Sequence, residues 1–136
     1  MVERKTAYGM AVEIDLAYDH AVDRTREELA KEGFGVLTEI DVKATLKKKL
    51  DVDFPPYVIL GACNPPLAHK ALSAEPDIGL LLPCNVVVYA TDDPKRSVVG
   101  IIDPVAQFEL VGNADIGPVA DEVLAKLQRV LQGVAS

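Results

Sequence analysis

Residues 80–103, LLLPCNVVVYATDDPKRSVVGIID, decide the fold class of this chain. An apolar run as far as Thr91 is followed by the polar turn DDPKR at 92–96 and by a second apolar run, SVVGIID, at 97–103. A turn this short joins antiparallel strands, because parallel strands need a crossover of about a dozen residues or more. The sequence therefore predicts an antiparallel hairpin in this stretch.

The rest of the chain alternates between strand and helix patterns. Alternating apolar residues predict strands over 8–17 and 34–40, and a run that is apolar on both faces predicts a central strand over Tyr57–Cys63. Three helices are expected to begin at the N-cap residues Asp19, Asp41 and Asn64, and the first of them is expected to end at Gly33. A fourth is expected over about 116–132, where apolar residues form one stripe. The predicted order is strand, helix, strand, helix, strand, helix, two strands and helix.

This order predicts an α+β fold, with residues 1–136 forming one domain. A doubly wound parallel sheet is the usual alternative for alternating strands and helices, but the hairpin is antiparallel and the middle helices are short. We therefore expect a mostly antiparallel sheet with its two long helices mainly on one face, and short extra helices. Since several strands are apolar on both faces, the other face also needs a cover, and a homodimer is the simplest one.

The composition excludes several classes of protein. Hydrophobic residues make up 49% and charged residues 26% of the 136 residues, which excludes a disordered chain and a disulfide-stapled scaffold. The net charge of −7 repels phosphate backbones, so no nucleic-acid partner is expected. The longest apolar run, Ile78–Ala90, is too short to cross a bilayer, and the charged start Met1–Thr6 is unlike a signal peptide. With two cysteines only, the sequence predicts a cytoplasmic protein with free thiols and no membrane partner.

Two Cys-Asn pairs, Cys63-Asn64 and Cys84-Asn85, are the residues most suggestive of a site. Cys63 is predicted to end a central strand just before a helix N-terminus, whose positive potential lowers a thiol pKa. If the two strands are neighbours, the thiols approach one another, and with His69 they form a set suited to a soft metal such as zinc. The structural alternative is that both cysteines are small buried hydrophobes, Asn64 is a helix cap and Asn85 satisfies a loop backbone.

Weaker candidates each have an equally ordinary structural explanation. His20 is either a base or a solvated helix residue, and Asp103 before Pro104 is either catalytic or a turn residue. A lysine run either binds a phosphate or an acidic partner or forms a solvated helix face; it comprises Lys43, Lys47, Lys48 and Lys49. No glycine-rich phosphate loop, CxxC pair, HExxH helix or GxSxG elbow occurs. No complete catalytic constellation is visible, no cofactor is firmly implied, and whether the protein is an enzyme stays open.

A longer set of motifs resembles a known family. These motifs are ILGACNP at 59–65, Ala68, Ala71, Glu75-Pro76, Gly79-Leu80, LPCNV at 82–86 and IDP at 102–104. Together they resemble the prokaryotic domain-of-unknown-function 302 family over about residues 7–110. The resemblance implies an α+β fold similar to the TATA-binding-protein arrangement, strand, helix, four strands and helix, and it implies no activity.

Three functional hypotheses follow from these residues. The favoured one is a homodimeric binding module whose apolar sheet face, or a pocket lined by Cys63, Asn64, Cys84 and Asn85, takes a small ligand or partner. The alternative is a thiol- or metal-dependent protein, redox-active or enzymatic, that uses Cys63 and Cys84 with His69. A third is an adaptor that docks through the lysine-bearing helix.

Overall fold

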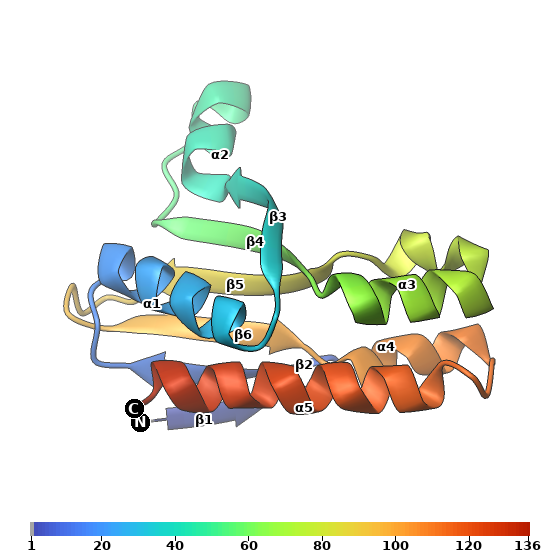
Figure 1. The fold of residues 1–136 in the computed structure, drawn as a ribbon. Coiled ribbons are helices and arrows are strands. Elements are labelled where there is room, and N and C mark those ends of the chain that lie inside the picture. Colours follow the sequence, from blue (N-terminus) through green and yellow to red (C-terminus); the bar gives the residue numbers. More distant parts are fainter. Residues whose placement is uncertain (1) are drawn as a thin grey trace.

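Six strands form one antiparallel sheet in the computed structural model, which describes residues 2–136 (Figure 1). The strands are ordered β1-β2-β6-β5-β4-β3, and every neighbouring pair is antiparallel. Their bounds are β1 (Val2–Lys5), β2 (Gly9–Ile14), β3 (Gly35–Asp41), β4 (Tyr57–Cys63), β5 (Cys84–Ala90) and β6 (Ser97–Ile102). The predicted α+β class and antiparallel sheet are confirmed.

Two long helices, α1 (Tyr18–Lys31) and α5 (Gly117–Val134), cover one face of this sheet (Figure 1). Helix α5 buries the stripe predicted from its spacing, Val119, Val123, Leu127 and Leu131. The shorter helices are α2 (Val42–Leu50), α3 (Pro65–Ala74) and α4 (Pro104–Phe108), with the 3-10 helices η1 (Pro76–Leu81) and η2 (Glu109–Val111).

The predicted hairpin is formed by β5 and β6 and supplies the centre of the core. Its register sets Val86 opposite Ile101 and Val88 opposite Val99. These four side chains are buried on the face that α1 and α5 cover. Burial of each such side chain contributes about 1.5–3 kcal/mol, so the hairpin anchors both long helices.

The sequence prediction was wrong at the ends of several elements. Strand β1 was missed because its four residues, VERK, show no apolar alternation and are held by pairing with β2. Leu80 and Leu81 belong to η1, so the extended run begins only at Cys84. Asp19 does not cap α1, because the N-cap is Ala17, whose side chain cannot accept a hydrogen bond. Gly33 ends that helix as predicted, with a φ of 83° that favours glycine.

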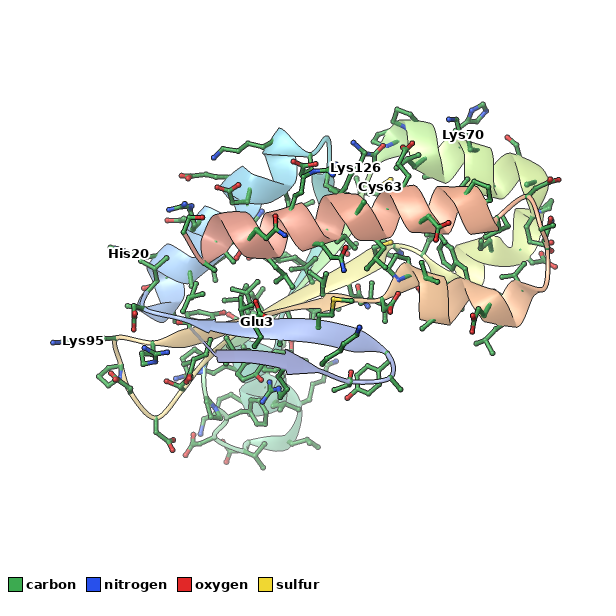
Figure 2. All side chains as sticks on the ribbon, turned by 90° about the horizontal axis from the view of Figure 1, so that it is seen from below. Glu3, His20, Cys63, Lys70, Lys95 and Lys126 are labelled. Atoms are coloured by element: carbon green, nitrogen blue, oxygen red, sulfur yellow. The ribbon has the colours of Figure 1, made fainter. Side chains whose placement is uncertain are left out.

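Helix α2 is separate from the layer of long helices. Asp41 caps it as predicted, accepting a hydrogen bond from the Ala44 N–H at 2.9 Å, but none of its side chains is buried. It packs against β3 and β4, and Figure 2 shows it (teal) on the opposite side of the sheet from α5. Strand β3, which leads into α2, is irregular: its register shifts between Val36 and Thr38, and Leu37 there is 68% exposed.

Within residues 2–136, none of the helices combines the length and the hydropathy that crossing a bilayer requires.

Candidate functional site

The two cysteines singled out in the sequence lie close together at one end of the sheet. Strands β4 and β5 are neighbours, and their register sets Ala62 opposite Cys84. Cys63 is the next residue of β4 after Ala62. Both cysteines line one cavity of 260 Å³, which we call the Cys63–Cys84 cavity. Figure 2 shows Cys63 beside α3, on the side of the sheet that α5 covers. The two cysteines therefore lie on neighbouring strands and line the same cavity.

The walls of the Cys63–Cys84 cavity are almost entirely apolar. Helix α3 contributes Leu67 and Ala71, and α5 contributes Val119 and Val123. Within the described residues 2–136, no acidic or basic side chain lines this cavity. An apolar lining of this kind favours uncharged ligands, because burying an unpaired charge is costly.

Asn64 holds the N-terminus of α3 against the C-terminus of α1. Its side-chain oxygen accepts from the Leu67 N–H at 3.5 Å, and its side-chain amide donates to the Glu32 carbonyl at 3.2 Å. Gly33 leaves room for this contact, since a Cβ there would lie 3.1 Å from the Asn64 amide nitrogen. Asn64 is the predicted helix cap, and it also lines the cavity, so its position fixes one wall of the site.

The thiol chemistry of the cavity is set mainly by burial. Burial, with a smaller contribution from the nearby Cys63, raises the pKa of Cys84 to about 11. The first turn of α3 offers no free donor to a thiolate at Cys63: Pro65 and Pro66 have no N–H, and the next two N–H groups bond to Asn64. A thiolate is the reactive form of cysteine, so this arrangement suits a packed thiol better than a nucleophile.

His69 does not join the two cysteines. It lies on the exposed side of α3 and lines a different surface hollow, with Lys70 and Glu122. This hollow shares Leu67 with the cavity, but neither cysteine lines it, and His69 does not line the cavity. Over residues 2–136, no three or more His, Cys, Asp and Glu side chains gather as a metal site would require. The expected zinc set of Cys63, His69 and Cys84 is therefore corrected: only the two cysteines line a common cavity, and His69 does not.

Asn85 points to the opposite face of the sheet from Cys84, as adjacent residues of a strand must. It is exposed and lines a shallow groove of 330 Å³ with Tyr57, Tyr89 and Gly100. The four predicted ligand-binding residues thus divide into two groups. Cys63, Asn64 and Cys84 share the cavity, and Asn85 does not.

These residues lie within a recognised family. The family model described as "Domain of unknown function DUF302" matches residues 10–134, which include every residue of the cavity. The chain belongs to the DUF302 family.

A solved DUF302 structure supports the same conclusion. The crystal structure of an uncharacterized conserved DUF302 protein from Bacillus stearothermophilus is similar to this chain, with 28% sequence identity and a TM-score of 0.85. The similarity covers 94% of this chain and 98% of that one. No curated protein matches the chain. The family resemblance drawn from the motifs is confirmed, and the likeness to the TATA-binding-protein arrangement stays a prediction.

The weaker candidates of this DUF302 protein have structural roles or exposed positions. Asp103 caps α4, accepting from the Val105 and Ala106 N–H groups at 2.9 and 3.2 Å. His20 is exposed on α1, at the far end of the molecule from Cys63 (Figure 2). The lysines of α2 are exposed as well, and Lys47 pairs with Asp51 at 3.0 Å.

One contact behind the sheet-side wall of the cavity was not predicted from the sequence. Gly61 lies against Pro83: a Cβ at Gly61 would clash with the Thr38 hydroxyl and lie 2.7 Å from the Pro83 ring. Pro83 itself lines the cavity. A glycine in the middle of an apolar strand marks a close approach of this kind, and that signal was available in the sequence.

Proposed function

We propose that this DUF302 protein is a binding module that takes a small, uncharged, apolar ligand in the Cys63–Cys84 cavity. The observation that carries this proposal is the 260 Å³ volume of a cavity with an apolar lining and no acidic or basic side chain in the described residues. Ligand sites are concave and mostly apolar, with few polar groups. The two thiols and the Asn64 amide are the polar groups that line this one.

The volume indicates the size of the ligand. An apolar cavity of about 150 Å³ stays dry and binds benzene. A cavity of 260 Å³ therefore suits a ligand of about ten non-hydrogen atoms, such as a bicyclic aromatic or a branched aliphatic molecule.

The entrance of the cavity has the same character as its interior. Leu37 and Leu72 line the cavity, yet they are 68% and 41% exposed. Leu37 lies in the irregular part of β3, and Leu72 lies on α3. Two leucines exposed at the entrance of an apolar cavity favour the uptake of an apolar ligand from solvent.

Titration with indole and benzene, followed by two-dimensional amide NMR of the whole chain, tests this proposal. We expect saturable shifts at Leu67, Ala71 and Cys84, and none of comparable size with benzoate, because the cavity offers no partner to a carboxylate. Ala68→Leu fills the cavity from α3, and we expect it to weaken binding at least tenfold. Ala44→Leu adds the same atoms at an exposed position on α2 and should leave binding unchanged.

Two outcomes would overturn the proposal. One is the absence of saturable shifts around the cavity in the wild-type protein. The other is equal binding by wild type and a folded Ala68→Leu variant, which would place the probe outside the cavity.

The alternative of a thiol-dependent protein has less support. A nucleophilic or redox role needs an accessible thiolate, and burial raises the pKa of Cys84 to about 11. Both cysteines are free thiols, which fits the reducing cytoplasm in which we propose that the protein acts.

A further inference from the structure

The sheet face opposite α1 and α5 is largely apolar, apart from Arg4, Thr6 and Asn85, and it has no helix across its centre in the described residues. We call it the open face and define it by Tyr57, Val87, Tyr89, Gly100 and Ile102, which line the 330 Å³ groove. The Tyr57 and Tyr89 rings stack with centroids 5.2 Å apart and planes 3° apart. The open face is therefore a flat surface with aromatic side chains of the sort enriched at protein interfaces.

A projecting segment lies at the margin of the open face. We call residues 41–56 the α2 arm, since they comprise α2 and the loop that leads to β4. The arm exposes Leu50 by 66%, Val52 by 43% and Phe54 by 38%. The Phe54 ring meets the Tyr57 ring edge-on at 6.2 Å, so the arm is continuous with the open face. Figures 1 and 2 together show α2 beyond the edge of the sheet, on the side away from α5.

We propose that the open face and the α2 arm form the interface between two copies of this chain, each arm lying against the open face of the other copy. A helix of nine residues is marginal in water without tertiary packing, and α2 buries no side chain within its own chain. A second copy supplies the missing packing for both arms at once. Such an interface is isologous, because each copy contributes the same two surfaces.

The area of the open face supports this arrangement. Six strands about 4.8 Å apart and about six residues long, at about 3.4 Å per residue, give a face of at most about 600 Å², because α2 packs against β3 and β4. A stable interface buries about 800 Å² on each partner. The sheet alone falls short of that value, and the exposed apolar side chains of the arm supply the remainder.

The charge distribution also favours a second copy as the partner. Helix α2 carries four lysines, and the α2 arm also holds Asp41, Asp51 and Asp53, so the arm has a net charge of +1 and leaves −8 on the rest of a chain of net charge −7. Exposed carboxylates lie at Asp92 and Asp93 in the β5–β6 turn, next to Lys95, and at Asp15 just after β2, where Asp15 pairs with Arg96. The lysine helix of one copy is therefore attracted to the acidic body of the other.

Sedimentation equilibrium of the whole chain at about 100 μM tests the proposal. We expect wild type to sediment at twice the monomer mass of 14.6 kDa. Leu50→Glu places a charge in the interface and should raise the dissociation constant at least tenfold. Leu80→Glu is the matched control: Leu80 is 88% exposed on η1, and this change should leave the dimer intact.

A pair of charge-reversing substitutions tests the electrostatic contribution to the proposed dimer and changes no apolar residue. Lys48→Glu with Lys49→Glu should weaken the dimer and reduce its sensitivity to salt. Lys70→Glu with Lys126→Glu makes the same charge change on the opposite side of the molecule from α2 (Figure 2) and should not weaken it.

A monomeric wild type at this concentration would overturn the proposal and leave the open face to a different macromolecule. A dimer that survives both Leu50→Glu and the Lys48, Lys49 reversal, or one that Leu80→Glu breaks equally, would place the interface elsewhere. These measurements do not involve the Cys63–Cys84 cavity, so they succeed or fail independently of the ligand proposal.

Discussion

Helices α5 and α2 flank opposite sides of one sheet, and they differ in what holds them there. Seven side chains of α5 are buried, whereas α2 has no buried side chain. Helix α5 draws its stability from the core of its own chain, as most helices of globular proteins do. Helix α2 has a good side-chain cap and regular geometry, yet it lacks that support. The comparison teaches that local helix signals and burial are separate properties, and that a helix with only the first is a candidate for contact with another molecule.

The largest expected effect comes from shortening one leucine on each helix. Leu127 is 0% exposed in α5, and Leu127→Ala should lower the free energy of unfolding by about 2–5 kcal/mol. Leu50 is 66% exposed in α2, and Leu50→Ala should change it by less than about 0.5 kcal/mol in the monomer. Urea unfolding at a concentration low enough to keep the chain monomeric measures both. Equal losses for the two variants would show that α2 is supported by its own chain after all.

A smaller loss of stability is expected from replacing a glycine in the interior strand β4, compared with a glycine in the edge strand β3. Gly61→Ala in β4 forces Thr38 and the Pro83 ring to move and should cost about 1–3 kcal/mol. Gly35→Ala in β3 meets no atom within 4 Å and should be close to neutral. Thermal unfolding of the two variants provides the comparison. If Gly61→Ala left the unfolding temperature unchanged, Thr38 and the Pro83 ring would be able to move aside at little cost in free energy.

The smallest expected effect is a change in the pH dependence of stability. The hydrogen bond from Lys31 at 2.9 Å, assisted by Arg24, outweighs burial and lowers the pKa of Glu28 below its usual 4.5. A lowered pKa means that this contribution is complete above about pH 4.5 and is lost as the pH falls through the pKa of the folded state. Glu28→Gln should therefore flatten the acid side of the stability curve, measured by unfolding between about pH 7 and pH 3.

The matched change on α2 is Asp51→Asn. Asp51 pairs with Lys47 at 3.0 Å, but its side chain is 87% exposed, so removal of the charge should alter the curve very little. Asparagine also tolerates the φ of 52° at this position. A larger effect for Asp51→Asn than for Glu28→Gln would contradict the expectation that the exposed carboxylate at the end of α2 contributes less than the buried carboxylate of α1.

Patterns confined to one element could be predicted from the sequence. The β5–β6 hairpin, the central strand β4, the Asn64 cap and the buried stripe of α5 all follow from spacing within short stretches. Strand β1 could not be predicted in this way, because its four mostly charged residues become a strand only through pairing with β2.

The candidate site was predictable only in part, for a similar reason. Cys63 and Cys84 can share a cavity only because β4 and β5 are neighbours. The sequence does not show which strands pair, so this proximity could be predicted only on the condition that they do. The rotation of α3 then placed Leu67 toward the cavity and His69 outside it. Asn85 was grouped with Cys84 by sequence proximity, although alternate residues of a strand face opposite sides. Contacts between elements decided each of these outcomes.

The irregular register of β3 has a consequence for how the sheet ends. An outermost strand offers unpaired N–H and C=O groups, and another chain can extend the sheet by adding a strand to it. The shift between Val36 and Thr38 interrupts the row of backbone groups that such an added strand would need. Acidic side chains at Glu39 and Asp41 lie on the same short strand, and the chain turns away into α2 directly after it. The β3 edge therefore resists the addition of further strands that would build a fibril. Association of two copies through their open faces can then stop at a dimer.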